Sequence, residues 1–339
     1  MVAPPSTPLY ASPGSLLESI PMNFGLTLLA GLIVLLAGGE LLVRGASALA
    51  RNLGVSPFVV GLTVVAFGTS APELAVNVSA ALSGNSDITF GNVIGSNIAN
   101  IGLIIGLTAL MKAFTVRRSI VSREIPVMLG VTALGIVLAL DARFGRVDGA
   151  ILLVCFVCFL FVTTRTALKD RNKDRFLEGA EGEEEAHKVM HWAPASLLTL
   201  AGLAGVLLGS DWTVDGASGV AVSLGMSQAV IGLTIVALGT SLPELTTSLF
   251  AVRKGQAELA IGNVVGSNIF NLLFILGVSS GIRAVEVPRG GFMDLIAMAI
   301  FSVVLLPFAM SRQRLARHEG LLLLAGYLAY MAWRTLSTS

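Results

Sequence analysis

Residues 61–107 read GLTVVAFGTSAPELAVNVSAALSGNSDITFGNVIGSNIANIGLIIGL, and residues 232–278 read GLTIVALGTSLPELTTSLFAVRKGQAELAIGNVVGSNIFNLLFILGV. The offset between these two copies is 171 residues without a gap, and 23 of the 47 aligned residues are identical. Both copies place Glu, Pro, Asn, Ser and Gly inside apolar sequence, although carboxylates and broken helices are costly in hydrocarbon. Such residues usually mark a transport path, and the duplication predicts a path built from two equivalent halves.

The composition predicts a membrane protein. Hydrophobic residues make up 54% of the 339 residues and charged residues 13%, and the mean hydropathy is +0.83. A soluble domain of this length could not bury so much apolar surface. Because a membrane-crossing helix needs about 20 apolar residues, we expect an all-α membrane protein with ten transmembrane helices. The expected spans are residues 23–47, 55–82, 86–111, 122–141, 147–166, 194–214, 225–252, 257–282, 291–311 and 318–336.

The charged residues predict the orientation of these spans. If the N-terminus is outside, 17 of the 22 Lys and Arg residues fall on the inner side, as the positive-inside rule requires. We therefore expect both termini outside the cell. The expected organisation is an N-terminal tail (1–22), a first five-helix repeat (23–166), a cytoplasmic loop (167–193) and a second five-helix repeat (194–339). The tail contains no Lys or Arg, so we expect no secretory signal.

Aligned residues of the two repeats indicate opposite orientations in the membrane. Five spans per repeat is an odd number, so the second repeat must begin on the other side. Arg44 on the inner side aligns with Asp215 on the outer side, and Leu82 on the outer side aligns with Arg253 on the inner side. An inverted-topology repeat is the best interpretation. The exception is one aligned basic pair, Lys112 and Arg283.

The GTSxPE segments at 68–73 and 239–244 predict a break in each helix. Pro72 and Pro243 lack an N–H and clash with a preceding carbonyl, so each helix must kink there. Carbonyl oxygens freed inside the membrane are tolerated only if they bind something or line water. Glu73 and Glu244 add one carboxylate each. Hydroxyl groups come from Thr69, Ser70, Thr240 and Ser241.

The GNxxGSNxxN segments at 91–100 and 262–271 add small and polar residues. Four glycines allow close helix approach: Gly91, Gly95, Gly262 and Gly266. The spacing i, i+4 places Ser96 and Asn100 on one helix face, and Ser267 and Asn271 on another. Crossing the four segments would form a cage of hard oxygen ligands with two negative charges. Such ligands suit Ca²⁺, which takes about 6–8 oxygens, and also Na⁺, whereas soft metals prefer Cys or His.

The paired GTSxPE and GNxxGSNxxN segments resemble the α-repeats of the cation/Ca²⁺ exchanger superfamily, specifically the prokaryotic sodium/calcium exchangers. The resemblance covers residues 30–112 and 201–283 and includes the shared GAS at 45–47 and 216–218. It implies that spans 1 and 6 slide across an eight-helix core. It also implies an ion-binding set of side chains and two backbone carbonyls: Thr69, Ser70, Glu73, Ser96, Asn100, Thr240, Ser241, Glu244, Ser267 and Asn271, with the carbonyls of Ala66 and Ala237.

Several positions leave alternatives open. The family often has Asp where this chain has Asn271, so exchange of either two or three Na⁺ per Ca²⁺ is compatible with the sequence. Glu40 and Asp211 are aligned acidic residues that could recruit cations, or could reach toward water or hydrogen-bond locally. We expect a structural role for Asn77. Four further asparagines are assigned to support of the broken backbone rather than to ion contact: Asn92, Asn97, Asn263 and Asn268.

The function predicted from these residues is secondary active antiport of Na⁺ and Ca²⁺ with Ca²⁺ bound between Glu73 and Glu244. Proton-coupled exchange of Ca²⁺ or another divalent cation is the alternative, although the proton-coupled relatives typically show GNxxE where this chain has GTSxPE. We expect no enzymatic activity, because a hydrolase signature such as HExxH is absent from the sequence. The net charge of +1 argues against nucleic-acid binding. We expect a monomer in the bacterial inner membrane, with the lipid bilayer as its surroundings, no cofactor, and Ca²⁺ and Na⁺ as substrates.

Overall fold

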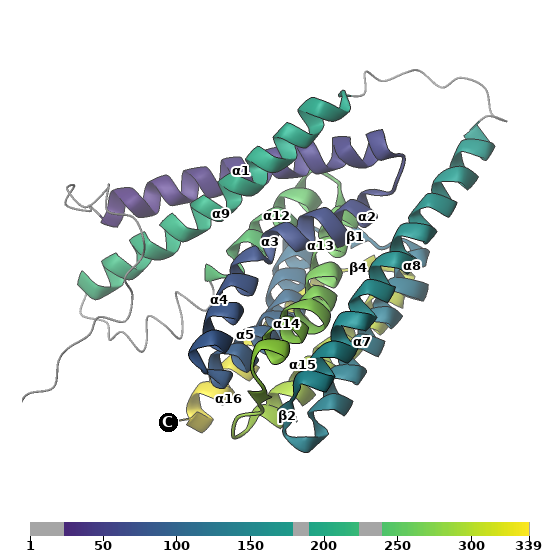
Figure 1. Ribbon diagram of the computed structural model, residues 1–339. Helices are drawn as coiled ribbons and strands as arrows, with labels where there is room; N and C mark the ends of the chain where they lie inside the picture. The colour runs from purple at the N-terminus through teal and green to yellow at the C-terminus, as the bar shows by residue number, and fades with distance from the viewer. Residues whose placement is uncertain (1–23, 179–189, 224–238, 339) are drawn as a thin grey trace, which may run out of the picture.

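The computed structural model describes residues 24–178, 190–223 and 239–338 (Figure 1). In the first repeat the elements are α1 (Phe24–Leu53), α2 (Pro57–Val60), the π-helical turn η1 (Gly61–Val65), α3 (Ala66–Thr69), α4 (Ala71–Ser83), α5 (Ser86–Ala99), the π-helical turn η2 (Asn100–Ile105), α6 (Gly106–Met111), β1 (Phe114–Thr115), the π-helical turn η3 (Ile120–Glu124), α7 (Ile125–Leu138), the 3₁₀ turn η4 (Ala139–Asp141), β2 (Arg143–Phe144) and α8 (Arg146–Glu178).

In the second repeat the described elements are α9 (Trp192–Ser223), α12 (Leu242–Arg253), α13 (Ala257–Phe270), the π-helical turn η6 (Asn271–Ile275), α14 (Leu276–Ile282), β3 (Val285–Glu286), α15 (Gly291–Met310), the 3₁₀ turn η7 (Ser311–Gln313), β4 (Arg314–Leu315) and α16 (Arg317–Thr338). The fold is therefore almost entirely helical, as the sequence predicts.

Not all ten expected spans meet the requirements for crossing a membrane. Within the described ranges seven helical segments are long and apolar enough, or eight if the bent pair Pro57–Thr69 and Ala71–Ser83 forms one span. The expected span 225–252 lies partly outside the described residues. Helix α16 has 22 residues but carries three charged ones, Arg317, Glu319 and Arg334, which lower its hydropathy.

Helix α8 is longer than the sequence analysis expected. It continues to Glu178, which is 178 − 166 = 12 residues beyond the expected end of the fifth span. Residues 167–178 contain no Gly or Pro, and the first glycine follows at Gly179. Nothing in the local sequence breaks the helix before that residue, so the first half of the expected loop is helical.

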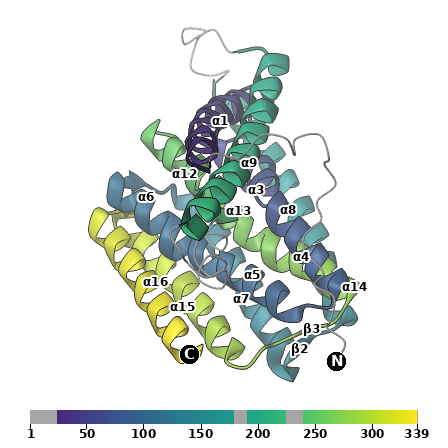
Figure 2. The same ribbon diagram turned by 90° about the vertical axis from the view of Figure 1, so that its left-hand side faces the viewer.

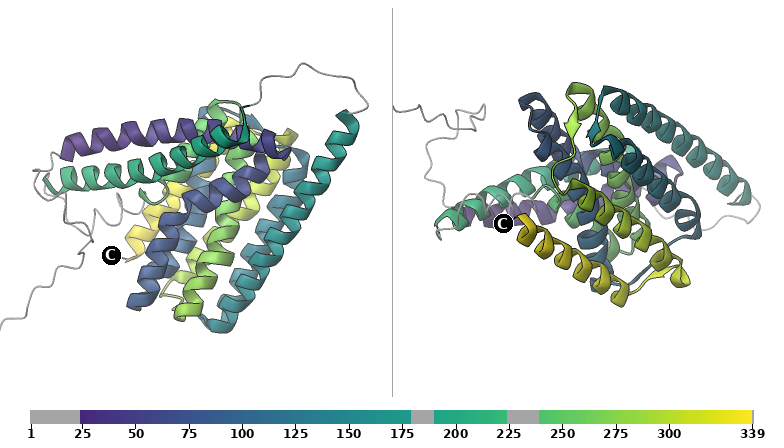
Figure 3. Two further views of the ribbon diagram at one scale, coloured as in Figure 1. Left: turned by 45° about the horizontal axis from the view of Figure 1, so that its top comes forward. Right: turned by 90° about the horizontal axis from the view of Figure 1, so that it is seen from below.

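Helices α1 and α9 lie side by side and cross the other helices at a steep angle (Figures 1 and 3). Glycine recurs at every seventh residue in both helices, at Gly31, Gly38 and Gly45 and at Gly202, Gly209 and Gly216. A Cβ atom added at Gly38 would lie 2.5 Å from the backbone nitrogen of Val206. The glycine stripe therefore allows the two backbones to touch, as small residues do in membranes.

The other helices form the bundle that holds the duplicated motifs. Among the described candidate spans, the two that contain the GSN segments are the most buried, because 78% of the most apolar 18 residues in Ser86–Met111 and 94% of those in Ala257–Ile282 are inside the protein. Their C-terminal parts contact two outer helices, because α6 packs against α16 and α14 packs against α8 (Figure 2). Adding 171 to the residue numbers of α6 gives 277–282, which lies within α14, and adding 171 to the start of α8 gives the start of α16. The two contacts are thus equivalent by the sequence repeat.

Two short antiparallel ribbons join the repeats. Strand β1 pairs with β4, with Phe114 opposite Leu315, and β2 pairs with β3, with Phe144 opposite Val285. Adding 171 to 114 gives 285, and subtracting 171 from 315 gives 144, so the ribbons are equivalent. They lie at opposite ends of the helix bundle (Figure 1). Each repeat is therefore bound to the other at both ends.

Lys112 and Arg283, the exception in the charge pattern, both lie at the C-terminal end of a neighbouring helix. Lys112 Nζ donates a hydrogen bond of 3.4 Å to the carbonyl of Arg253, the last residue of α12. The guanidinium of Arg283 lies against Gly84, which ends α4 with φ = 76°. A cation is favourable beside the last carbonyls of a helix. These contacts explain why a basic residue is kept in both repeats.

Candidate functional site

The GTSxPE segment breaks its helix where the sequence predicts. Helix α3 ends at Thr69 and α4 begins at Ala71, with a bend of 45° between the two halves. Ser70 at the break has φ = −84° and ψ = 10°. Because Pro72 has no N–H, it cannot donate the i−4 helical hydrogen bond to the Gly68 carbonyl. In the second repeat Ser241 has nearly the same conformation, φ = −90° and ψ = 0°, immediately before α12.

Both breaks place a glutamate in the first turn of a helix. Glu73 lies in the first turn of α4 and Glu244 in the first turn of α12, where the helix dipole favours a negative charge. Their exposed fractions are only 2% and 1%. Ser70, three residues before Glu73, hydrogen-bonds to Glu244, so the two breaks bring the two carboxylates into the same buried region. Glu73 Oε2 and Glu244 Oε2 are both buried without a hydrogen-bond partner. Unpartnered carboxylate oxygens buried beside a second carboxylate are the environment that a cation would stabilise.

Hydrogen bonds connect the break in the first repeat to the second repeat. Ser70 Oγ donates to Glu244 Oε1 at 3.1 Å, and Ser70 Oγ lies 3.2 Å from Ser267 Oγ. Thr69 Oγ1 donates to Asn263 Oδ1 at 3.2 Å. The hydroxyl groups of GTSAPE therefore contact the helices that carry the second glutamate and the second GSN segment.

Other predicted residues form contacts within their own helices or begin π-helical turns. The Ala66 carbonyl accepts a hydrogen bond of 3.0 Å from Ser70 N, and Ser96 Oγ donates to Asn92 Oδ1 at 3.4 Å. Asn100 and Asn271 each begin a π-helical turn, a feature often found at functional sites.

Two second-repeat hydroxyl residues, Thr240 and Ser241, lie at the break before α12. Ala237 lies outside the described residues. Of the twelve predicted ligands, hydrogen bonds bring Ser70, Glu244 and Ser267 together, and the other described ones lie on the four spans that carry the two motifs.

The glycines of the second GSN segment allow the close approach that the sequence predicts, whereas a Cβ atom added at Gly91 or Gly95 in the first segment would meet no described atom within 4 Å. A Cβ atom added at Gly266 would lie 2.5 Å from the carbonyl oxygen of Leu62 and 2.8 Å from Ala66 Cβ. The reciprocal contact occurs at Gly61, where an added Cβ would lie 2.5 Å from the Leu259 carbonyl. Helix α13 therefore lies directly against the first half of the broken span, which brings the second repeat to the GTSAPE break.

Some asparagines assigned to backbone support contact the site directly. Asn263 Nδ2 donates to the Glu244 carbonyl at 3.4 Å and to Ser248 Oγ at 3.3 Å. Asn97 and Asn268 hydrogen-bond to the side chains of Asn271 and Asn100. The signal for their importance was already present in the sequence, because every one of these asparagines is identical in the two copies.

Asn77 and Glu40 occupy defined environments. Asn77 Nδ2 donates to the Glu73 carbonyl at 2.6 Å, whereas its buried Oδ1 has no partner. Glu40 forms ion pairs with Arg44 and with Lys254, the latter at 3.3 Å. The Glu40 carboxylate is therefore held by neighbouring cations, in agreement with the alternative that it bonds locally.

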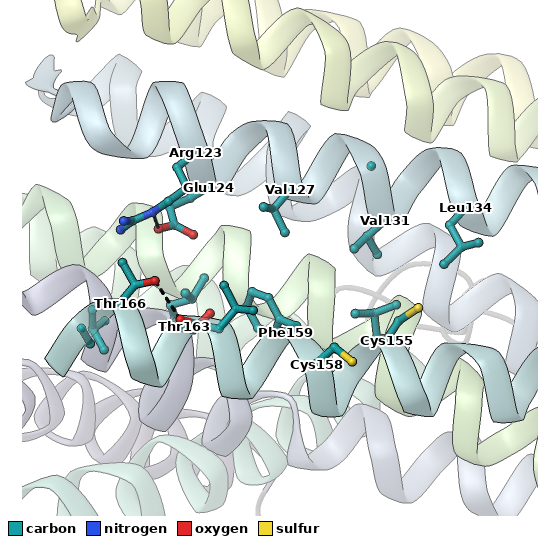
Figure 4. Close-up of a pocket in the computed structure, with 16 residues that line it drawn as sticks. Arg123, Glu124, Val127, Val131, Leu134, Cys155, Cys158, Phe159, Thr163 and Thr166 are labelled. Atoms are coloured by element: carbon teal, nitrogen blue, oxygen red, sulfur yellow. Dashed lines mark hydrogen bonds and ion pairs between the residues drawn. The ribbon is translucent and has the colours of Figure 1, made fainter. Parts of the chain in front are cut away.

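An apolar groove of about 350 Å³ lies apart from both motif glutamates, mainly between α7 and α8 (Figure 4). Its one charged end is the ion pair between Arg123 Nε and Glu124 Oε1 at 2.7 Å. Cys155 and Cys158 line the groove as free thiols on α8. Because no residue of the GTSxPE or GNxxGSNxxN segments lines the groove, the oxygen-rich centre around Glu73 and Glu244 is the better candidate for an ion site.

Known proteins resemble this chain along nearly its whole length. Two segments, 24–165 and 195–336, match the family model for the sodium/calcium exchanger protein. The chain is 40% identical over 306 residues to the putative antiporter CaxA of Alkalimonas amylolytica, covering 89% of this chain and 95% of that protein. It is 33% identical over 344 residues to the sodium/calcium exchanger MaX1 of Methanosarcina acetivorans, covering 92% and 98%.

A solved structure has the same fold. The sodium-calcium exchanger NCX_Mj, soaked with Na⁺ and Ca²⁺, superposes with a TM-score of 0.79 at 34% sequence identity. The superposition covers 91% of this chain and 98% of NCX_Mj. The two family matches correspond to the two repeats found in the sequence. The chain is therefore an integral membrane transporter that belongs to the sodium/calcium exchanger family of the cation/Ca²⁺ exchanger superfamily.

Proposed function

We propose that this protein is a secondary antiporter that exchanges Na⁺ for Ca²⁺ by alternating access, with Ca²⁺ bound between Glu73 and Glu244. The observation that carries the proposal is the pair of buried carboxylates from the two repeats, each with one unpartnered oxygen. A divalent cation would balance both charges in a region of low dielectric constant. Neutral oxygens close by would complete the shell of about 6–8 ligands that Ca²⁺ takes.

The proposed neutral ligands are the predicted hydroxyl, amide and carbonyl groups that accompany the glutamates. They are Thr69, Ser70, Ser96, Asn100, Thr240, Ser241, Ser267 and Asn271 with the carbonyls of Ala66 and Ala237. Support comes from the contacts of Ser70 with Glu244 and Ser267. Support also comes from Asn271 Oδ1, which is buried without a partner.

Sodium is the proposed coupling ion. The GTSxPE form of the motif favours Na⁺ over H⁺, and the relative MaX1, which covers 92% of this chain, is named a sodium/calcium exchanger. Because each glutamate oxygen that binds Ca²⁺ could instead bind Na⁺, the two ions would compete for one set of ligands. Competition of this kind is what an antiporter requires, since one ion must leave before the other binds.

We further propose ten spans arranged as two inverted five-helix repeats, 23–166 and 194–339, joined by a cytoplasmic loop at 167–193. The equivalent β-ribbons at opposite ends of the bundle support the inversion. The excess of Lys and Arg on one side supports termini outside the bacterial inner membrane, with the tail 1–22 outside.

The proposed moving unit is the pair of spans 1 and 6, which contain α1 and α9. These helices lie against each other along the glycine stripe and cross the remaining bundle at a steep angle (Figure 3). One chain supplies both carboxylates, so we propose that the monomer is the transporting unit.

The decisive experiment uses purified protein in liposomes. An outward Na⁺ gradient at equal pH on both sides should drive uptake of radioactive calcium, and collapse of that gradient should stop the uptake. A pH gradient without Na⁺ is the matched comparison. Calcium uptake driven by the pH gradient and indifferent to Na⁺ would replace this proposal with proton-coupled exchange.

A further inference from the structure

Asn97 and Asn268 are buried, equivalent residues that the proposed ion site does not use. They are 171 residues apart, and their exposed fractions are 1% and 2%. Each lies three residues before a proposed ligand, Asn100 or Asn271. A buried asparagine has two donor hydrogens and one acceptor oxygen to satisfy, so its neighbours determine which way the amide points.

A backbone carbonyl sets the orientation of each amide. Asn97 Nδ2 donates to the carbonyl oxygen of Asn268 at 3.3 Å, and Asn268 Nδ2 donates to the carbonyl oxygen of Asn97 at 3.4 Å. A carbonyl oxygen can only accept a hydrogen bond, so the amide atom that faces it must be the nitrogen. The same nitrogens approach methionine sulfurs, Asn97 to Met298 at 3.6 Å and Asn268 to Met128 at 3.7 Å.

The amide oxygens of this pair then reach across to the opposite repeat. Asn97 Oδ1 accepts from Asn271 Nδ2 at 3.1 Å, and Asn268 Oδ1 accepts from Asn100 Nδ2 at 2.9 Å. Because Asn97 has only its oxygen left for this contact, the facing atom of Asn271 must be its nitrogen. The oxygen of Asn271 therefore points to the other side, where it is buried without a partner.

We propose that Asn97 and Asn268 are positioning residues that orient, in the opposite repeat, the amide oxygens of Asn271 and Asn100 toward the transported cation. This inference rests on the exchange function proposed above. The same hydrogen bond explains why residue 271 is an amide. A carboxylate at this position would place an acceptor oxygen next to Asn97 Oδ1, which is also an acceptor. Asn97 could not turn its nitrogen to such a carboxylate without losing the bond to the Asn268 carbonyl.

The hydrogen bonds between opposite repeats predict which pairs of substitutions are energetically coupled. Asn97→Ala removes the acceptor for Asn271 but leaves the Asn97 backbone carbonyl, which orients Asn268 and through it Asn100. Asn97→Ala and Asn271→Ala should therefore be coupled in a double-mutant cycle, whereas Asn97→Ala and Asn100→Ala should be additive. The second cycle is the matched control, because Asn100 is closer to Asn97 in the sequence.

The test measures equilibrium binding of radioactive calcium to the purified full-length protein. Removing a group that orients a metal ligand typically costs about 10-fold to 100-fold in affinity. We expect Asn97→Ala to weaken binding by about 10-fold in the wild-type background. In the Asn271→Ala background the same change should have almost no effect. The equivalent cycle in the other repeat combines Asn268→Ala with Asn100→Ala, and its control combines Asn268→Ala with Asn271→Ala. This second cycle gives an independent result if a variant of the first cycle does not fold.

Two outcomes would overturn the proposal. If the loss of Ca²⁺ affinity caused by Asn97→Ala is additive with both Asn271→Ala and Asn100→Ala, Asn97 orients neither residue. If Asn97→Ala is coupled more strongly to Asn100→Ala than to Asn271→Ala, Asn97 does not act on the opposite repeat. Na⁺-driven Ca²⁺ uptake by the wild-type protein is measured in parallel. Intact uptake with an additive cycle would refute only the positioning role, whereas absent uptake would refute the exchange function itself.

Discussion

The hydroxyl of Ser70 donates a hydrogen bond of 3.1 Å to the carboxylate of Glu244, across the boundary between the two repeats. The two residues are 174 positions apart in the chain. Ser70 occupies the helix break itself, and Glu244 occupies the first turn after the equivalent break. The two breaks therefore meet, so that one cation could contact groups from both halves of the protein.

Replacement of either motif glutamate should abolish Ca²⁺ transport. Glu73→Gln or Glu244→Gln would leave a bound Ca²⁺ with one uncompensated charge, and breaking a buried ion pair costs about 3–5 kcal/mol. That cost corresponds to a loss of about 100-fold or more in affinity. Calcium uptake in proteoliposomes is the measurement. Glu286→Gln, at the exposed residue of β3, is the control that should transport normally. Near-normal uptake by Glu244→Gln would refute the paired site.

Removal of the Ser70 hydroxyl should weaken Ca²⁺ binding without preventing insertion. Ser70→Ala deletes a proposed ligand and a hydrogen bond to a charged group, which is worth about 1.5–3 kcal/mol. We expect the half-saturating Ca²⁺ concentration to rise about 10-fold or more. Ser122→Ala is a suitable control because Ser122 is exposed and its hydroxyl donates to the carbonyl of Ser119, outside both motifs. An unchanged half-saturation for Ser70→Ala would exclude this hydroxyl from the site.

Transport should move net charge across the membrane. With Asn at both 100 and 271, three Na⁺ would give the site a charge of +1, and neutral oxygens around the glutamates could hold the extra ion. Efflux of three Na⁺ for one Ca²⁺ would carry positive charge outward, so an inside-positive potential should accelerate Ca²⁺ uptake. Vesicles clamped with valinomycin and potassium provide the measurement. Flux that is indifferent to the imposed voltage would indicate two Na⁺ per Ca²⁺.

The contact between α13 and the broken span should tolerate no added methyl group. A Cβ atom in Gly266→Ala would lie 2.5 Å from the Leu62 carbonyl oxygen, and overpacking of this kind costs about 1–3 kcal/mol. We expect lower thermal stability in detergent and slower exchange. Gly281→Ala is the control, because an added Cβ there meets no described atom within 4 Å. Equal melting temperatures for both variants would show that the helices can separate at no cost.

The duplicated motif made the main features predictable. The helix break at Ser70, the burial of Glu73 and Glu244 and the close approach at Gly266 all follow from residue chemistry that is local to the motif. The extent of α8 was misjudged because a polar sequence was interpreted as a loop, although it contains no residue that ends a helix.

Contacts between the repeats could not be predicted in the same way. The crossed hydrogen bonds of Asn97 and Asn268 depend on which helix faces which, and a repeated sequence alone does not state the partner. The pairing of β1 with β4 has the same origin, since two-residue strands carry no periodic pattern. Ion contact was assigned to Asn100 and Asn271 by resemblance, whereas the groups that orient them became visible only in three dimensions.

The β1–β4 ribbon also has a consequence for biosynthesis. Phe114 pairs with Leu315, which the ribosome adds 315 − 114 = 201 residues later. At about 5–20 residues per second, this delay is about 10–40 s. During that time Phe114 has no strand partner, so this end of the first repeat is fixed to the second repeat only after almost the whole chain has been made.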